Sequence, residues 1–131
     1  MSIPTSHLVL PSGAELSNLR YDPLAGCYAA AAFFPPSAGM FRGHFPGDAI
    51  APGYCLLELI LGVLMASGQV CMFKTIELAK FHLPVCPGDR LDVDIQLLPG
   101  ETNGFACVAA VRRGDQLVLE FSGLLAASQN G

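Results

Sequence analysis

An almost uninterrupted apolar segment, residues 54–66, limits what this chain can fold into. It reads Tyr-Cys-Leu-Leu-Glu-Leu-Ile-Leu-Gly-Val-Leu-Met-Ala, and its single charged residue is Glu58. A helix that spans a bilayer needs about 20 apolar residues, so this segment is too short to be one. Pro52 is of the type favoured at a helix start, and Gly68 is of the type favoured just beyond a helix end. The segment therefore predicts a helix over residues 53–67 that is apolar all round and enclosed on every side.

The pattern changes to strands after Gly68. Apolar and polar residues alternate without exception over residues 90–97, as in a strand with one buried face. Strands are also expected at residues 26–34, 70–83, 105–112 and 116–127, whereas residues 1–24 are expected to be mixed, with turns. A helix followed by four hairpin-linked strands predicts one α+β domain over residues 1–131, with an antiparallel sheet wrapped around a long central helix. This is the hot-dog architecture, although other helix-on-sheet folds share the pattern.

The composition adds limits on partners and compartment. Charged residues make up 14% of the chain and apolar residues 52%, whereas soluble chains average about 25% charged residues. So few charges indicate apolar surface that a partner covers, so we expect an oligomer. The net charge of −4 argues against nucleic-acid binding. The N-terminus does not resemble a signal peptide, and five cysteines without a CxxC pair indicate buried free thiols in a reducing cytoplasm rather than a metal site.

Two side chains and one stretch of backbone are candidates for chemistry. His44 lies in a loop with glycines and a proline just ahead of the predicted helix, whereas His7 and His82 are expected at the surface. Glu58 is the single carboxyl on the apolar helix, where it is either a structural residue bonded to backbone or serine, or an acid that exchanges a proton near neutrality. The N–H groups of Gly53 and Tyr54 at the helix start lack intrahelical acceptors and are candidates to bind an oxyanion.

These residues form a motif that resembles a known family. The stretch from Gly43-His44-Phe45-Pro46-Gly47 through Pro52-Gly53 to Glu58 is similar to the signature of the β-hydroxyacyl-acyl-carrier-protein dehydratases of the FabA/FabZ type. A second block, residues 79–89, resembles the strand and turn that follow the helix in that family. The sequence departs from the family pattern at Gly62, where a glutamine is usual, at Ala49 and at Tyr54. Because of these departures, the sequence does not determine the length and shape of the acyl chain.

The resemblance implies dehydration of a (3R)-hydroxyacyl thioester to a trans-2-enoyl thioester, in fatty-acid or related polyene or polyketide-type biosynthesis. His44 would remove the α-proton, the Gly53 N–H would bind the thioester carbonyl, and Glu58 of the partner subunit would protonate the departing hydroxyl. The residues implied to bind substrate are Phe45, Pro52 and Tyr54.

The resemblance also implies the partners. They are an acyl carrier protein with the substrate on phosphopantetheine and other copies of the chain, as a homodimer or a trimer of dimers. No metal or cofactor is implied, and no membrane. The basic residues that are candidates to meet an acidic carrier protein are Arg42, Lys74, Lys80, Arg90, Arg112 and Arg113. Two alternatives stay open: an acyl-thioester hydrolase on the same fold, and a non-catalytic acyl-binding subunit.

Overall fold

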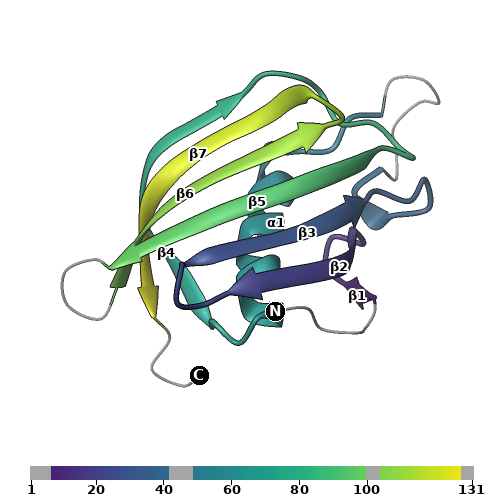
Figure 1. Cartoon of the computed structure of the whole chain (residues 1–131). Coiled ribbons are helices and arrows are strands. Elements are labelled where there is room, and N and C mark those ends of the chain that lie inside the picture. The colour runs from purple at the N-terminus through teal and green to yellow at the C-terminus, as the bar shows by residue number, and fades with distance from the viewer. Residues whose placement is uncertain (1–6, 42–48, 100–103, 128–131) are drawn as a thin grey trace.

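A curved antiparallel sheet wraps around one α-helix in the computed structural model, which describes residues 7–41, 49–99 and 104–127 (Figure 1). The helix is α1 (Gly53–Ala66). The strands are β1 (Leu8–Val9), β2 (Glu15–Asp22), β3 (Cys27–Phe33), β4 (Cys71–Phe81), β5 (Arg90–Pro99), β6 (Gly104–Arg113) and β7 (Gln116–Ala127), and a short 3-10 helix, η1 (Gly39–Phe41), precedes α1. This arrangement confirms the predicted α+β hot-dog fold.

The strand order is β1-β2-β3-β5-β6-β7-β4, which corrects one predicted link. β4 and β5 are not a hairpin, because β4 pairs with β7 at the edge of the sheet and β5 pairs with β3. The turn before β5 bonds to the end of β3: the Phe34 N–H donates to the Asp89 carbonyl (3.0 Å), and the Gly88 N–H donates to the Phe34 carbonyl (2.6 Å). These bonds start β5 alongside β3 rather than alongside β4.

The N-terminal segment is more regular than predicted. β1 and β2 pair as an antiparallel hairpin, and β2 pairs with β3. A register shift lies between Ser17 and Arg20, where Asn18 has a positive φ of 52°. This irregularity breaks the two-residue alternation of buried and exposed side chains, so the sequence pattern did not indicate a strand here.

The core lies between α1 and the inner face of the sheet. The alternation over β5 is confirmed, with Leu91, Val93, Ile95 and Leu97 buried and the residues between them exposed. Gly68, with φ of 92°, ends α1 as expected: the N–H of Gln69 donates to the Leu64 carbonyl (2.8 Å).

No helix among the described residues is long and apolar enough to span a membrane.

One face of α1 is not covered, so the prediction of a helix enclosed on every side is wrong for the single chain. Tyr54 is 68% exposed and Met65 50% exposed, and Leu57 and Leu61 between them are only half-buried. These four residues recur at helical spacing, and we call them the open helix stripe. The sheet covers the opposite face of the helix, where Cys55, Leu59 and Val63 are buried, and it cannot reach this one.

The cysteines are all free, but they are not all buried as predicted. Cys55 and Cys107 are buried, Cys71 and Cys86 are half-buried, and Cys27 is exposed. Tyr28, the next residue on β3, is buried on the side of the helix. Because neighbouring residues of a strand point to opposite faces, Cys27 faces away from the helix.

Candidate active site

At the start of α1, two backbone N–H groups have no acceptor in the described part of the chain. Pro52 is the N-cap, with φ of −60° and ψ of 150° and no side-chain capping bond. The Ala51 N–H donates to the Val85 carbonyl (2.7 Å), and the Cys55 N–H donates to the Pro52 carbonyl (3.0 Å). Among the described residues nothing accepts from the N–H groups of Gly53 and Tyr54. These groups lie at the positive end of the helix dipole, which favours a bound negative charge.

A cavity of about 480 Å³ opens beside Gly53. Its walls are mostly apolar, and its lining residues are Ile50, Ala51, Gly53, Leu56 and the run Phe81–Val85. A Cβ atom added at Gly53 would lie 2.9 Å from Cζ of Phe81. Glycine therefore fits at this wall of the cavity, whereas a side chain would press against the aromatic ring.

Glu58 lies elsewhere on the helix, and Ser12 binds it. The Ser12 hydroxyl donates to Glu58 Oε1 (2.7 Å), and the Ser12 N–H donates to the same oxygen (3.3 Å). The carboxyl is half-buried rather than buried, and it does not line the cavity at Gly53. Within one chain the structure therefore does not bring Gly53 and Glu58 into one cavity, since five residues turn the helix by about 500°.

The remaining predicted site residues are His44, Phe45, Pro52 and Tyr54. His44 and Phe45 lie outside the described residues. Pro52 and Tyr54 do not line the cavity, and Tyr54 belongs to the open helix stripe.

His82 is exposed, as the sequence predicted, and it also lines the cavity, where it bonds Glu120 through Nε2 (2.9 Å). The sequence signal that could have pointed to its place at the cavity was its position next to Phe81 in the block, residues 79–89, that resembles the family.

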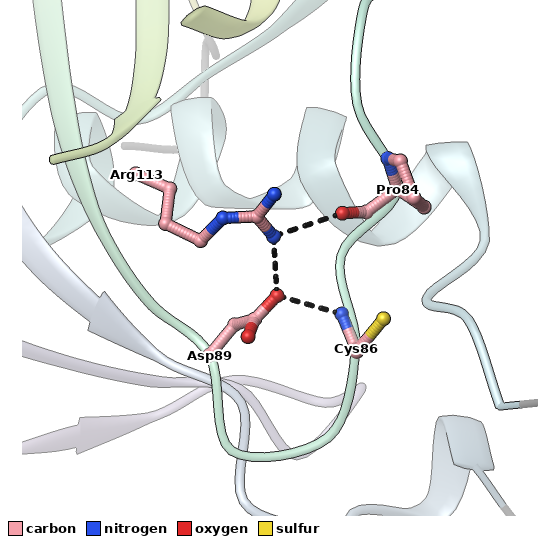
Figure 2. A network of polar contacts seen from close by, with 4 residues as sticks. All are labelled: Pro84, Cys86, Asp89 and Arg113. Carbon is pink, nitrogen blue, oxygen red and sulfur yellow. Dashed lines mark hydrogen bonds and ion pairs between the residues drawn. The ribbon is translucent and has the colours of Figure 1, made fainter. Parts of the chain in front are cut away.

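Beyond the cavity, the Pro84–Asp89 turn is fixed by a network of polar contacts (Figure 2). Arg113 Nη1 donates to Asp89 Oδ2 (2.7 Å) and to the Pro84 carbonyl (3.0 Å). The Cys86 N–H donates to the same Asp89 oxygen (2.8 Å). Arg113 is thus engaged within the chain, so it is less suited than predicted to bind an acidic partner. Arg90 is also engaged, since its guanidinium lies 4.5 Å from the centre of the Phe33 ring.

The electrostatics around Glu58 affect its neighbour Cys55. Burial raises the pKa of the Cys55 thiol, the charge of Glu58 raises it further, and contacts with Tyr54 and Ser12 act in the opposite direction. Ionisation of the Cys55 thiol is therefore disfavoured. No group of three or more His, Cys, Asp or Glu residues that could hold a metal ion occurs in the described part of the chain.

A second hollow, of about 500 Å³, lies on the outer face of β2, β3, β5 and β6, where Ala29 and Ala110 are small. It contains none of the predicted site residues.

Known proteins resemble this chain in sequence. A 3-hydroxyacyl-acyl-carrier-protein dehydratase FabZ of Haemophilus influenzae (strain PittEE) is 36% identical over 67 residues, which are 44% of this chain and 45% of that protein. The FabZ of Granulibacter bethesdensis is 34% identical over 96 residues, 66% of this chain and 56% of that protein. The chain spans about half the length of the curated relatives it matches.

Solved structures share the fold. The dehydratase heterocomplex ApeI:P of Xenorhabdus doucetiae superposes with a TM-score of 0.64 at 22% identity, over 85% of this chain and 96% of that one. The PaaI protein of the phenylacetic acid degradation operon of E. coli superposes with a TM-score of 0.64 at 16% identity, over 87% and 82%. Residues 25–117, which run from just before β3 into β7, match the ApeI-like family of ApeI dehydratases, so the chain belongs to that family.

Proposed function

We propose that this protein dehydrates a 3-hydroxyacyl thioester to a trans-2-enoyl thioester. The observation that carries the proposal is the N–H of Gly53, which has no acceptor among the described residues and lies at the wall of an apolar cavity, in a chain of the ApeI dehydratase family. A thioester carbonyl that gains negative charge is stabilised by such a donor, because the donor is fixed in place before the reaction begins. The apolar walls suit the acyl chain.

The reaction would need a base and an acid in addition to this donor. His44 takes the proton from the α-carbon, and the electron pair of that C–H bond moves toward the carbonyl held by Gly53. The bond between the β-carbon and its hydroxyl then breaks, and Glu58 gives the hydroxyl a proton, so that water leaves. The proton held by His44 finally restores the acid. No redox partner is needed, since the substrate only loses water.

We propose that a second copy of the chain supplies the acid. Glu58 follows Leu57 and lies one turn from Tyr54 and Leu61, so it borders the open helix stripe. β4 is one of the two edge strands of the sheet and also exposes apolar side chains; those exposed on β4 are Met72, Ile76, Leu78 and Phe81. An unpaired edge beside an apolar stripe favours a partner that pairs with the edge and covers the stripe. The same contact would bring a partner's Glu58 toward this chain, in a dimer or a trimer of dimers.

The carrier of the acyl group is part of the proposal. The curated relatives are named as dehydratases of acyl-carrier-protein thioesters, which supports a phosphopantetheine arm as the substrate's handle. A cytoplasmic reaction agrees with the five free cysteines.

The test is a dehydration assay with purified protein. A series of 3-hydroxyacyl thioesters of graded chain length, on acyl carrier protein and on coenzyme A, is followed by mass spectrometry for the loss of water. His44→Ala and Glu58→Gln are each expected to lower turnover by about a hundredfold or more, because acid–base catalysis is lost. His7→Ala is the matched control, since His7 is an exposed histidine that pairs with Glu15 and does not line the cavity.

Other products would contradict the proposal. Free acid and thiol in place of enoyl thioester would indicate an acyl-thioester hydrolase, and binding without turnover would indicate an acyl-binding subunit. Light scattering gives the oligomeric state, and a monomer with full activity would remove the role of the partner's Glu58. If activity requires a different, co-expressed subunit, the second chain is a relative rather than an identical copy, as in the dehydratase heterocomplex ApeI:P of Xenorhabdus doucetiae.

A further inference from the structure

The N-terminal hairpin lies outside the family match, yet it reaches the candidate acid. β1 and β2 precede residue 25, where the match begins. The turn between them is tight: the Leu10 N–H donates to the Ala14 carbonyl (2.8 Å), and the Gly13 N–H donates to the Leu10 carbonyl (2.8 Å). Gly13 has φ of 100°, a conformation that favours glycine. Ser12 is therefore held at the tip of a fixed turn.

The orientation of the Ser12 hydroxyl is also fixed. Its oxygen accepts a hydrogen bond from the Ala14 N–H (3.4 Å), and its hydrogen is donated to Glu58 Oε1 (2.7 Å). The Ser12 N–H is a second donor to Oε1 (3.3 Å). Both donors contact one carboxyl oxygen, and among the described residues Glu58 Oε2 has no hydrogen-bond partner. Oε2 is thus the oxygen available to a substrate.

Packing on the helix keeps the hairpin in this place. Leu10 is buried, and its side chain lies over Gly62, one turn beyond Glu58. A Cβ atom added at Gly62 would lie 2.7 Å from Leu10 Cδ2 and 3.3 Å from Leu16 Cδ1. The glycine in the middle of α1 therefore lets the hairpin approach closely enough for Ser12 to reach the carboxyl.

We propose that Ser12 is a positioning residue for Glu58 in the dehydration step, an inference that rests on the proposed function. The proton on Glu58 Oε2 passes to the oxygen of the departing hydroxyl. The bond between this hydroxyl oxygen and the β-carbon breaks, and water leaves. The carboxyl is left with a negative charge, which the two Ser12 donors stabilise at Oε1. Donors fixed where charge develops lower the barrier, because they do not have to reorganise during the step. They also keep Oε2 directed away from the turn.

A pair of variants of equal shape tests the role of the hydroxyl. Ser12→Thr keeps the hydroxyl and Ser12→Val replaces it with a methyl group, so any effect of the added bulk on folding is common to both. We expect Ser12→Val to lower kcat about tenfold relative to Ser12→Thr, with KM unchanged, as for a lost hydrogen bond to a charged group. Ser17→Val is the matched control, because Ser17 is an exposed serine on β2. Equal kcat values for the Thr and Val variants would overturn the inference.

A double-mutant cycle tests whether Ser12 acts through Glu58. In a Glu58→Gln background, exchanging Thr for Val at residue 12 should change the residual turnover by less than about twofold. A full tenfold loss in that background would mean that Ser12 acts elsewhere, and the inference would be wrong. If the wild-type protein dehydrates thioesters and Glu58→Gln abolishes the activity, failure of the Thr/Val comparison refutes only the role of Ser12. If Glu58→Gln keeps full activity, the proposed role of Glu58 and the inference are both refuted.

Discussion

Replacing Arg113 with alanine would break the network that holds the Pro84–Asp89 turn (Figure 2). The Arg113 and Asp89 side chains are 30% and 21% exposed, so the pair is neither a surface ion pair nor a fully buried one. Exposed pairs contribute about 0–1 kcal/mol, and removing one partner of a buried pair costs about 3–5 kcal/mol. The bond to the Pro84 carbonyl is lost as well. We therefore expect Arg113→Ala to lower the free energy of unfolding by about 2 kcal/mol.

The assay is denaturation at one fixed protein concentration, because an oligomer makes the midpoint depend on concentration. A loss of about 2 kcal/mol lowers Tm by roughly 5–10 °C in a chain of this size. The urea midpoint should fall without a change in the m-value. Arg112→Ala is the matched control, since Arg112 is the neighbouring residue and is exposed. Equal stability of the two variants would refute the reasoning.

The same variant should also affect activity, because the turn holds both ends of the segment that contains His44. The Val85 carbonyl accepts from the Ala51 N–H, and Asp89 pairs with Phe34 through backbone bonds. Phe34 and Ala51 thus flank that segment, and both depend on the turn that Arg113 fixes. Arg113→Lys keeps the charge, but one ammonium group matches the two acceptors less well than a guanidinium, so an intermediate effect on Tm is expected.

Three further predictions follow from close approaches and burial. Gly53→Ala should fold, because the Phe81 ring it would meet at 2.9 Å is 45% exposed and can move, but it should lower kcat/KM about tenfold or more in the dehydration assay. Gly26→Ala should destabilise more than Gly68→Ala in thermal unfolding, since both glycines have positive φ but the Cβ at Gly26 alone would strike a backbone carbonyl of β5. Burial raises the pKa of the Cys107 thiol from 9.0 to about 12, and the urea midpoint should therefore fall as the pH rises above 9.

The sign of the pH effect comes from proton counts. Above about pH 9 the unfolded chain releases the Cys107 proton while the folded chain keeps it, so the unfolded state binds fewer protons. Stability is therefore unaffected below this pH and falls toward about pH 12, by up to about 1.4 kcal/mol per pH unit. Cys107→Ala should reduce this slope, and an unchanged slope would contradict the assignment. Full activity of Gly53→Ala would contradict the geometry at the cavity. Equal unfolding temperatures of Gly26→Ala and Gly68→Ala would contradict the close approach at Gly26.

The sequence was most informative where local chemistry decides structure. The apolar run between Pro52 and Gly68 predicted α1, and the alternation over residues 90–97 predicted β5 with the correct buried face. The sheet order was not accessible in the same way, because pairing of β4 with β7 depends on contacts between segments far apart in the chain. β2 was missed because its irregularity at Asn18 removes the two-residue period on which the prediction relied.

The same division holds at the candidate site. The sequence predicted that α1 starts at Gly53, since a proline N-cap and a glycine at the first helical position are local signals, and the role of the Gly53 N–H as a donor stays a prediction. Ser12 could not be found in this way, because it lies 46 residues from Glu58 in the chain. A signal was nevertheless present at Gly62, since a glycine inside a helix costs about 1 kcal/mol relative to alanine and often marks a close approach. The residue that approaches is Leu10, which belongs to the same turn as Ser12.

The open helix stripe and β4 carry part of the exposed apolar surface that the low charge content predicts. Exposed apolar residues occur on several elements, but many of them lie on the open helix stripe and on β4, an edge strand of the sheet: Tyr54, Met65, Met72, Ile76, Leu78 and Phe81. A pattern that is apolar all round predicts that a helix is covered, but it does not distinguish cover by the chain's own sheet from cover by another chain. The structure distinguishes the helix residues that the chain's own sheet covers from those that it leaves uncovered. Leu59 and Val63 are buried within the chain, whereas Tyr54 and Met65 are exposed. Glu58 lies at the boundary between them, where a half-buried carboxyl is fixed by Ser12 on one side and open to a partner on the other.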